Sequence, residues 1–219
     1  MFDPKAVAAA IQARQTFKVL GDPDAPVQFS AEAAAQNQQV VLEALRVAGW
    51  APFHYARGTG GLAEPWRAHV LWHEPCQHLA HRLFEWFPDL SPSSKIPRML
   101  AACGALALVT WLPQFGHVED PKPAQVRTDE EHLMASSAMV QNLLLLLTAH
   151  GMGTYWSSGG VLGSAPLFRH LGIPETERLL AAVFVEYPET LGEDRERRPG
   201  KHRASRSDGW ISEVAVEGA

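Results

Sequence analysis

Apolar residues recur at helical spacing after Ser30. Val41, Leu45 and Ala48 share one face of a helix there, because residues three and four positions apart lie on the same side. Ser30 is a suitable N-cap, and Gly49 interrupts the pattern. The pattern therefore predicts an amphipathic helix between Ser30 and Gly49.

A later stretch is apolar on nearly every face of the helix that it predicts. Thr128 and Glu131 have the spacing of a capping box, in which each side chain bonds the backbone N–H of the other residue. The stretch ends at His150, and Gly151 suits the left-handed position that follows many helices. A helix with so little polar surface is expected at the centre of a domain.

Short apolar runs without helical spacing predict strands. Ala105–Trp111 and Leu180–Tyr187 are the clearest of them, and His69–Trp72 is a shorter one. Pro113–Val126 contains several prolines and no periodicity, so we expect a surface excursion or lid there. Three further helices are predicted at Lys5–Gln15, His78–Phe87 and Ser164–Leu171.

The order of these elements predicts an α+β protein with a small sheet surrounded by helices. The chain has 219 residues, of which 46% are hydrophobic, and this is enough for one core. We therefore expect a single domain over residues 1–219, in which residues 1–10 begin the first helix. Residues 188–219 form a charged C-terminal tail that the pattern assigns to no element.

Charge and composition argue against several classes of protein. The net charge of -5 gives no reason to expect binding to nucleic acid or to an anionic membrane surface. The most apolar run, Ala138–Ala149, is shorter than the roughly 20 residues that span a bilayer. The first ten residues lack the basic start and apolar run of a signal peptide. Because Cys76 and Cys103 are the only cysteines, a reducing compartment and a cytoplasmic location are expected.

Two basic segments are candidate phosphate ligands. The five residues from Arg14 to Lys18 carry two cations and a hydroxyl, and alternate residues of an extended chain point the same way. Arg14, Thr16 and Lys18 are therefore placed to hold a phosphate through charge-assisted hydrogen bonds. Lys201 and Arg203 form a second pair of cations in the tail. Taken alone, each segment is more simply explained as a solvated basic surface.

Two other segments have the composition of walls around a flat ligand. The run from Trp50 to His54 precedes a glycine-bearing loop and Glu64-Pro65-Trp66-Arg67, and aromatic residues beside prolines make stiff surfaces. Gly151–Gly160 follows the central helix, and its glycines let backbone N–H groups approach a ligand closely. Its spacing is that of neither a P-loop nor a dinucleotide fingerprint. Loop packing and helix termination explain these segments if each is taken alone.

Together and in this order, the four segments resemble the nitroreductase family of FMN enzymes. The shared pattern begins with Arg-x-Ser/Thr-x-Arg/Lys after the first helix and an Ala-Pro loop leading to Pro-Trp. It continues with a long apolar helix that ends in a glycine-rich turn containing Trp-x-Ser/Thr-Gly. A segment like Leu171–Glu177 (LGIPETE) and a strand closing in Tyr-Pro complete the pattern. The resemblance extends from about Ile11 to Arg203.

The resemblance implies a three-layer α+β fold with a small, mainly antiparallel sheet, and a homodimer with two FMN sites at its interface. It implies an oxidoreductase in which NADH or NADPH reduces the flavin, which then reduces a small electron-poor acceptor, such as a nitroaromatic or a quinone, in a ping-pong scheme. The flavin does the chemistry, so no catalytic residue is assigned, although His54 is a candidate proton donor. The resemblance places at the cofactor Arg14, Gln15, Thr16, Lys18, Pro52, Phe53, His54, Glu64, Trp156, Ser157, Ser158, Gly159, Lys201 and Arg203.

Some residues depart from the family pattern. Gln15 stands where a second arginine is common, and Glu64 stands where a glutamine often precedes Pro-Trp. No asparagine follows Pro52 in a loop that residues 57–62 lengthen. A carboxylate near the flavin disfavours its anionic reduced form. These departures keep open a second hypothesis, that the chain is a flavin-binding sensor or store with little turnover.

Metal binding and a plain interaction domain are rival hypotheses from other classes. His69, His73, Cys76, His78 and His81 lie close together in the sequence, and His78 and His81 share a helix face. Their spacing fits no standard zinc pattern, so no metal site is expected. A helical interaction domain without a cofactor would purify colourless.

Overall fold

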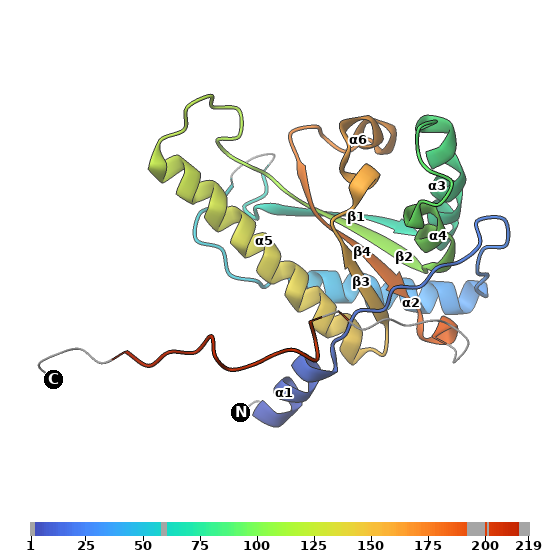
Figure 1. Cartoon of the computed structure of the whole chain (residues 1–219), viewed down its shortest axis with the longest axis horizontal. Helices are drawn as coiled ribbons and strands as arrows, with labels where there is room; N and C mark the ends of the chain where they lie inside the picture. Colours follow the sequence, from blue (N-terminus) through green and yellow to red (C-terminus); the bar gives the residue numbers. More distant parts are fainter. Residues whose placement is uncertain (1–2, 58–60, 192–199, 201, 215–219) are drawn as a thin grey trace, which may run out of the picture.

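One four-stranded antiparallel sheet, in the order β1-β2-β4-β3, forms the middle layer of the protein (Figure 1). The computed structural model describes residues 3–57, 61–191, 200 and 202–214. The strands are β1 (Trp66–Trp72), β2 (Ala105–Trp111), β3 (Gly153–Ser157) and β4 (Arg178–Glu186). The helices are α1 (Pro4–Ala13), α2 (Ala31–Ala48), α3 (His73–Trp86), α4 (Lys95–Ala102), α5 (Pro123–Ala149) and α6 (Ala165–Leu171), with short 3-10 turns at Gly160–Gly163 and Pro188–Thr190.

Helices cover both faces of the sheet, which gives the three layers that the resemblance implied. Successive residues of β2 point to opposite faces, as the geometry of a strand requires. Ala107 and Val109 pack into the core that α2 and α5 share with the sheet. Leu106 and Leu108 pack into the second core, with α3, α4 and α6. Both sides of β2 are therefore apolar, and this explains its unbroken hydrophobic run. The predicted α+β class and antiparallel sheet are confirmed.

The predicted capping box is wrong, because α5 begins earlier than the sequence pattern suggested. The helix begins at Pro123, whose fixed φ suits the first helical position. The Gln125 side chain accepts a hydrogen bond from the Lys122 backbone N–H at 2.7 Å. Thr128 lies inside the helix and donates to the backbone carbonyl one turn earlier. Glu131 therefore lies two turns inside α5 and is not needed to cap it.

Two elements were missed, and both are short. β3 lies within Gly151–Gly160, which we interpreted as a glycine-rich loop. Gly151 does end α5 as predicted: its φ is +74°, and the Met152 N–H bonds back to the Leu147 carbonyl at 2.9 Å. The next five residues then pair with β4. α4 spans eight residues and contains Pro97, so it has neither the length nor the composition that marks a helix in sequence.

Other boundaries moved by a few residues. α1 ends at Ala13, two residues before the predicted end, and leaves Arg14 in extended backbone. β1 begins at Trp66, three residues earlier than predicted, because it pairs with β2 along its whole length. α3 begins directly after β1, at His73. The strand and the helix thus take up residues that the sequence pattern assigned to no element.

α5 is the one helix in the described part of the chain that is long and apolar enough to cross a membrane by length and composition. It runs across the sheet and packs against α2 (Figure 1). Leu143, Leu144 and Leu147 are buried in the core between these elements. These contacts make α5 a core helix of the fold.

A buried acid joins the sheet to the loop before β4. The Glu177 carboxylate lies 2.7 Å from His69 Nε2 on β1 and accepts a hydrogen bond from the Thr110 hydroxyl on β2. Burial by itself raises the pKa of Glu177. The opposing effects are larger: hydrogen bonds from His69 and Thr110, and the positive charges of His69 and Arg67, lower the pKa. The net result is a pKa below the usual value. The last residue of the LGIPETE segment is therefore a structural anchor.

This anchor predicts a loss of stability in acid. The folded-state pKa of Glu177 lies below the unfolded value. Its contribution to the stability of the fold is therefore complete above about pH 4.5 and is lost as the pH falls through the folded-state pKa. Glu177→Gln should lower the free energy of unfolding at neutral pH by about 1–3 kcal/mol and flatten its acid dependence. Urea unfolding across this pH range measures both effects. Glu175→Gln is the control, because Glu175 forms an ion pair with Arg169 on the surface. Such a surface pair contributes less than about 1 kcal/mol to stability. Equal pH profiles for the wild type and Glu177→Gln would contradict the assignment.

Candidate functional site

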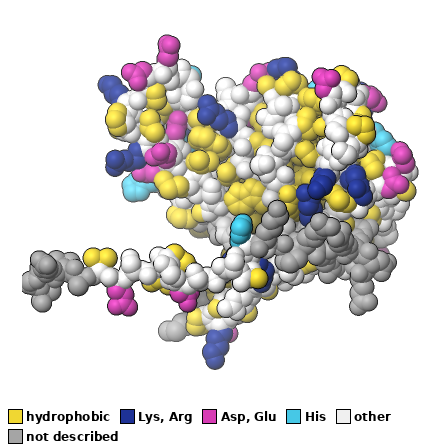
Figure 2. Space-filling model, in the orientation of Figure 1, with side chains coloured by type: hydrophobic (Ala, Val, Ile, Leu, Met, Phe, Trp, Pro, Cys, Tyr) yellow, Lys and Arg dark blue, Asp and Glu magenta, His cyan; other side chains and the backbone are white. Residues whose placement is uncertain are grey.

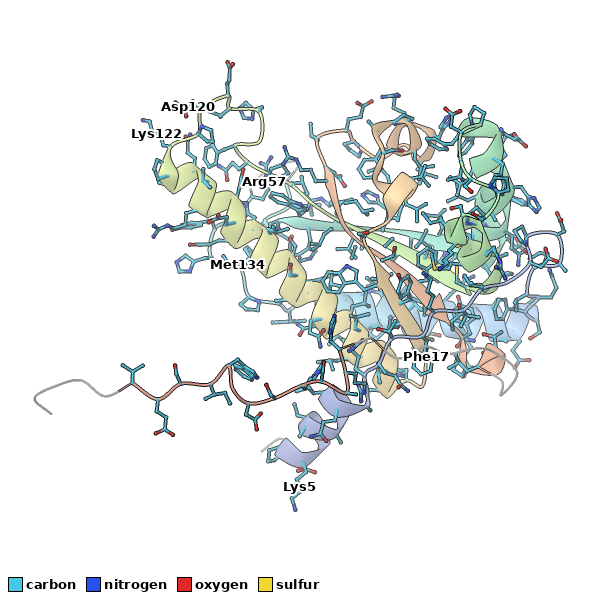
Figure 3. All side chains as sticks on the ribbon, viewed as in Figure 1. Lys5, Phe17, Arg57, Asp120, Lys122 and Met134 are labelled. Carbon is cyan, nitrogen blue, oxygen red and sulfur yellow. The ribbon has the colours of Figure 1, made fainter. Side chains whose placement is uncertain are left out.

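The basic segment after α1 lies beside the glycine-rich strand. Thr16 forms a parallel bridge with Thr154 of β3, and the Phe17 N–H donates to the Thr154 carbonyl at 2.8 Å. Figure 3 shows Phe17 where this segment passes the end of the sheet. The fold thus brings together two of the four segments that the sequence singled out, although more than 130 residues separate them.

A cavity of about 530 Å³, here called the strand cavity, lies where these two segments meet α5. Arg14 and Thr16 line it from one side, and Trp156 and Ser158 line it from the other. Leu144, Gln141, Leu180, Ile11 and Arg206 complete the lining. The lining of this cavity therefore combines cations and a hydroxyl with an indole ring and leucines.

A second cavity of about 900 Å³, the arm cavity, adjoins the first and shares Arg14, Thr16 and Arg206 with it. Its wall is the C-terminal arm, defined as residues 202–214, which leaves the body beside α1 and extends away from it (Figure 1). The other lining residues are Gln15, Gly200, His202, Arg203, Ser205, Ser207, Asp208 and Trp210. Most of them are polar or basic, so this cavity is suited to an anion.

Three arginines converge at the junction of the two cavities. Burial lowers the pKa of Arg14, and the positive charges of Arg203 and Arg206 lower it further. Arg203 Nη1 donates to the Arg14 carbonyl at 2.8 Å, and its second terminal nitrogen donates to the Gln12 carbonyl. These carbonyls are at the C-terminal end of α1, where a cation is favoured. An anion bound here would relieve the mutual repulsion of the arginines. Lys201, the other predicted cation of the tail, lies outside the described residues.

The end of β3 and the turn after it contribute two residues that line the strand cavity and two that shape the backbone. Trp156 keeps 38% of its surface exposed, and its indole N–H donates to the Leu180 carbonyl at 3.4 Å. The Ser157 hydroxyl accepts a hydrogen bond from the Gly159 N–H at 3.1 Å. Gly159 has a φ of +90°, which side-chain-bearing residues rarely adopt. Ser158 lines the cavity between them.

Several predicted residues lie elsewhere in a single chain. Lys18 points away from Arg14 and Thr16, with its ammonium 4.9 Å from the centre of the Tyr155 ring. Its predicted alignment with them is therefore not observed. Among the described residues Glu64 lines neither cavity, and its carbonyl accepts a hydrogen bond from Arg67 at 2.8 Å.

Pro52, Phe53 and His54 line a third cavity, the loop cavity, of about 420 Å³. It lies on the outer side of α5, and Glu131, Met134, Ala135 and Ala138 complete its lining. Figure 2 shows hydrophobic side chains gathered on this visible face, along α5. The structure thus divides the predicted cofactor residues of one chain between the strand and arm cavities and the loop cavity.

The segment predicted to be a lid extends beyond the N-terminal end of α5. Figure 3 labels Asp120 and Lys122 near its tip. Arg57 donates from Nε to the Leu112 carbonyl at 3.1 Å, and Asp129 Oδ1 accepts from the Gln114 N–H at 2.6 Å. Residues 113–122 are therefore tied at their base both to the loop after α2 and to α5.

Sequence reasoning missed Arg206, Leu180 and Gln141. Arg206 follows Arg203 by three residues, so the tail already contained a signal for a larger basic cluster. Leu180 and Gln141 carry no signal, because only the packing of β4 and α5 brings them to the cavity.

Two of the histidines that suggested metal binding, His69 and His73, have other partners. His69 pairs with Glu177, and His73 packs its ring edge-on against Phe29 at 5.2 Å. Cys76 is buried in the second core. The described residues contain no group of three or more histidine, cysteine or acidic side chains placed to hold a metal. The metal hypothesis therefore gains no support from the structure.

Comparisons with known proteins give the chain its relatives. The Bacillus subtilis protein YfhC, whose name assigns it provisionally to the NAD(P)H nitroreductases, is 27% identical over 169 residues, which are 75% of this chain and 80% of that protein. The fold is similar to a nitroreductase-like family protein from Bacillus cereus, with a TM-score of 0.61, 21% identity and 100% of both chains covered. A nitroreductase with bound FMN from Bacteroides fragilis has a TM-score of 0.55 and 17% identity over 95% of this chain and 98% of that chain.

The family assignment depends on the sequence match, since identities this low in solved structures support the fold alone. The family model described as the nitroreductase family matches residues 28–185, which is well over half of the chain. The match excludes Arg14–Lys18 and the arm, but it includes the residues of α5, β3 and β4 that line the strand cavity. The chain belongs to the nitroreductase family.

Proposed function

We propose that the protein is an oxidoreductase that binds FMN and uses it to pass hydride from NADH or NADPH to small electron-poor acceptors. The observation that carries the proposal is that Arg14 and Trp156 line the same cavity. The family match and the FMN in the Bacteroides fragilis structure support the choice of cofactor. The name of the Bacillus subtilis relative supports NAD(P)H as the reductant.

The residues of the strand and arm cavities fit FMN at both ends. A flavin mononucleotide has a phosphate at one end and a flat, largely apolar ring at the other. Arg14, Arg203 and Thr16 would hold the phosphate through charge-assisted hydrogen bonds. Trp156 and Leu180 would support the ring, and the backbone of the turn at Gly159 would approach it closely. Bound FMN supplies the electron carrier, and these side chains position it and exclude water.

We propose that donor and acceptor use the same face of the site in turn, as in a ping-pong scheme. No side chain in the two cavities needs to act as an obligatory acid or base for hydride transfer. His54 is exposed beside Tyr55, with ring centres 5.0 Å apart, and remains the candidate that would deliver a proton to a reduced acceptor.

We also propose that the active form is a cytoplasmic homodimer. In one chain α1 has no buried residue, and Val7 and Ile11 are half exposed. The arm projects from the body (Figure 2). Trp210 is 81% exposed on it, and Ile211 and Val214 are exposed as well. Single soluble chains rarely leave such apolar groups uncovered. A second copy related by a twofold axis would cover these surfaces and bring its own loop cavity towards the strand cavity.

Anaerobic mixing with NADH or NADPH tests the proposed function. The oxidoreductase should be yellow as purified, and its flavin absorbance should bleach within seconds and return when a nitroaromatic or quinone is added. A yellow protein whose colour persists after mixing would instead support the sensor or store. A colourless protein that takes up no FMN would contradict both hypotheses.

A further inference from the structure

Glu131 lines the loop cavity, and the fold leaves one of its carboxylate oxygens without a partner. Glu131 Oε2 is buried, and no hydrogen bond or salt bridge joins it to another described residue. Burying such an oxygen without a donor costs free energy, since water no longer solvates it. Glu131 lies two turns inside α5, so helix capping does not explain its position. A donor supplied by a ligand would remove this cost.

The rest of the loop cavity is suited to a flat ring. Phe53 is fixed edge-on against Trp66, with ring centres 5.6 Å apart and an interplanar angle of 86°. Met134 also lines the cavity, is 60% exposed, and lies on the outer side of α5 in Figure 3. Ala135 and Ala138 leave the floor of the cavity shallow and apolar. Concave, mostly apolar sites with a few polar groups are the usual form of small-molecule sites.

The position of the cavity walls is set by contacts outside the cavity. His132, the residue after Glu131, lies with its Nε2 3.1 Å from the Tyr55 carbonyl. This contact holds the loop against α5 on the side opposite Met134. The carboxylate and the aromatic wall are therefore held at a fixed separation, which is a condition for selective binding.

We infer that the loop cavity binds flat aromatic molecules that carry a cationic or N–H donor group, and that Glu131 selects them over anionic aromatics. The inference rests on the proposed function, in which this cavity borders the flavin of the partner subunit and admits the electron acceptor. It narrows the acceptors to uncharged or cationic aromatic molecules with an N–H group near the ring. Aromatic carboxylates are disfavoured, because they would place a second negative charge against Glu131.

Three probes of nearly equal shape test the inference: benzamidine is cationic, benzamide is neutral and benzoate is anionic. Titration calorimetry on the purified protein at neutral pH should show benzamidine binding about tenfold more tightly than benzamide, the effect of one charge-assisted hydrogen bond. Benzoate should bind most weakly. Glu131→Gln should bring benzamidine and benzamide within about twofold of each other and improve benzoate. Glu130→Gln is the matched control, because it removes the same charge from the exposed neighbouring residue.

Flavin content, read from the absorbance of the same samples, separates this inference from the proposed function. A benzamidine preference that disappears in Glu131→Gln and persists in Glu130→Gln supports the cavity assignment, even in a protein that contains no flavin. A yellow protein that binds all three probes equally, or loses the preference equally in both variants, overturns it. Equal melting temperatures for the two variants ensure that the comparison is made on folded protein.

Discussion

Arg14→Glu is expected to purify without flavin and to bind added FMN about 100-fold more weakly than the wild type. The substitution removes charge-assisted hydrogen bonds to the phosphate, each worth about 1.5–3 kcal/mol, and puts a negative charge in their place. Arg14 is one of the two arginines, with Arg206, that line both the strand cavity and the arm cavity. Replacing Arg14 should therefore weaken phosphate binding at any position within the junction of the two cavities. Quenching of flavin fluorescence on titration with the apoprotein gives the affinity.

The matched control for this prediction is Lys5→Glu. Lys5 is on the same helix, at the end far from the cavities, where Figure 3 labels it. The variant has the same change in net charge, so general electrostatics alone would weaken FMN binding equally in both. FMN should instead stabilise the wild type and Lys5→Glu against heat and leave Arg14→Glu unaffected. Full flavin occupancy in Arg14→Glu would contradict the phosphate assignment.

Trp210→Ser is expected to weaken the proposed homodimer by roughly 30-fold in Kd, because a buried tryptophan at an interface typically contributes about 2 kcal/mol. In one chain this side chain is 81% exposed on the arm, where it also lines the arm cavity. Its loss should therefore leave the unfolding of the single chain unchanged. Sedimentation over a range of protein concentrations gives the dimer dissociation constant.

Phe84→Ser is the control for the arm. Phe84 is also an exposed aromatic residue, but it is on α3, at the end of the molecule opposite the arm (Figure 1). General loss of surface hydrophobicity would weaken association in both variants, whereas loss of a specific contact weakens it in Trp210→Ser alone. A Trp210→Ser protein that dimerises as tightly as the wild type would show that the arm does not cover the partner.

Regular patterns in the sequence predicted the layers of the fold well. α2 and β2 are strongly patterned, and each lies where its pattern indicated. The C-terminal end of α5 was also predicted, because only a glycine suits the left-handed turn at Gly151. The start of α5 was not, since the spacing of Thr128 and Glu131 occurs inside helices as well as at their ends. β3 was missed because its pairing with β4 depends on contacts distant in sequence.

In the candidate site, too, some residues were predicted from the sequence and others were not. Arg14, Thr16, Trp156 and Ser158 were named from the sequence, and the structure brings them to one cavity. Arg206, Leu180 and Glu131 were not named as site residues, because their positions depend on how the arm, β4 and α5 pack. Lys18 shows the converse error: strict alternation placed it beside Arg14, but its ammonium lies over Tyr155. Local pattern identifies which chemistry is available, and packing decides which groups meet.

The most direct test of the whole account is a crystal structure of the protein purified in the presence of FMN. The account predicts a twofold dimer in which the phosphate is within hydrogen-bonding distance of Arg14 and Arg203. The flavin ring should lie against Trp156, with the partner subunit's His54 facing it. An FMN bound away from Arg14, or cavities that remain closed to the ring in every pairing of two chains, would contradict the account.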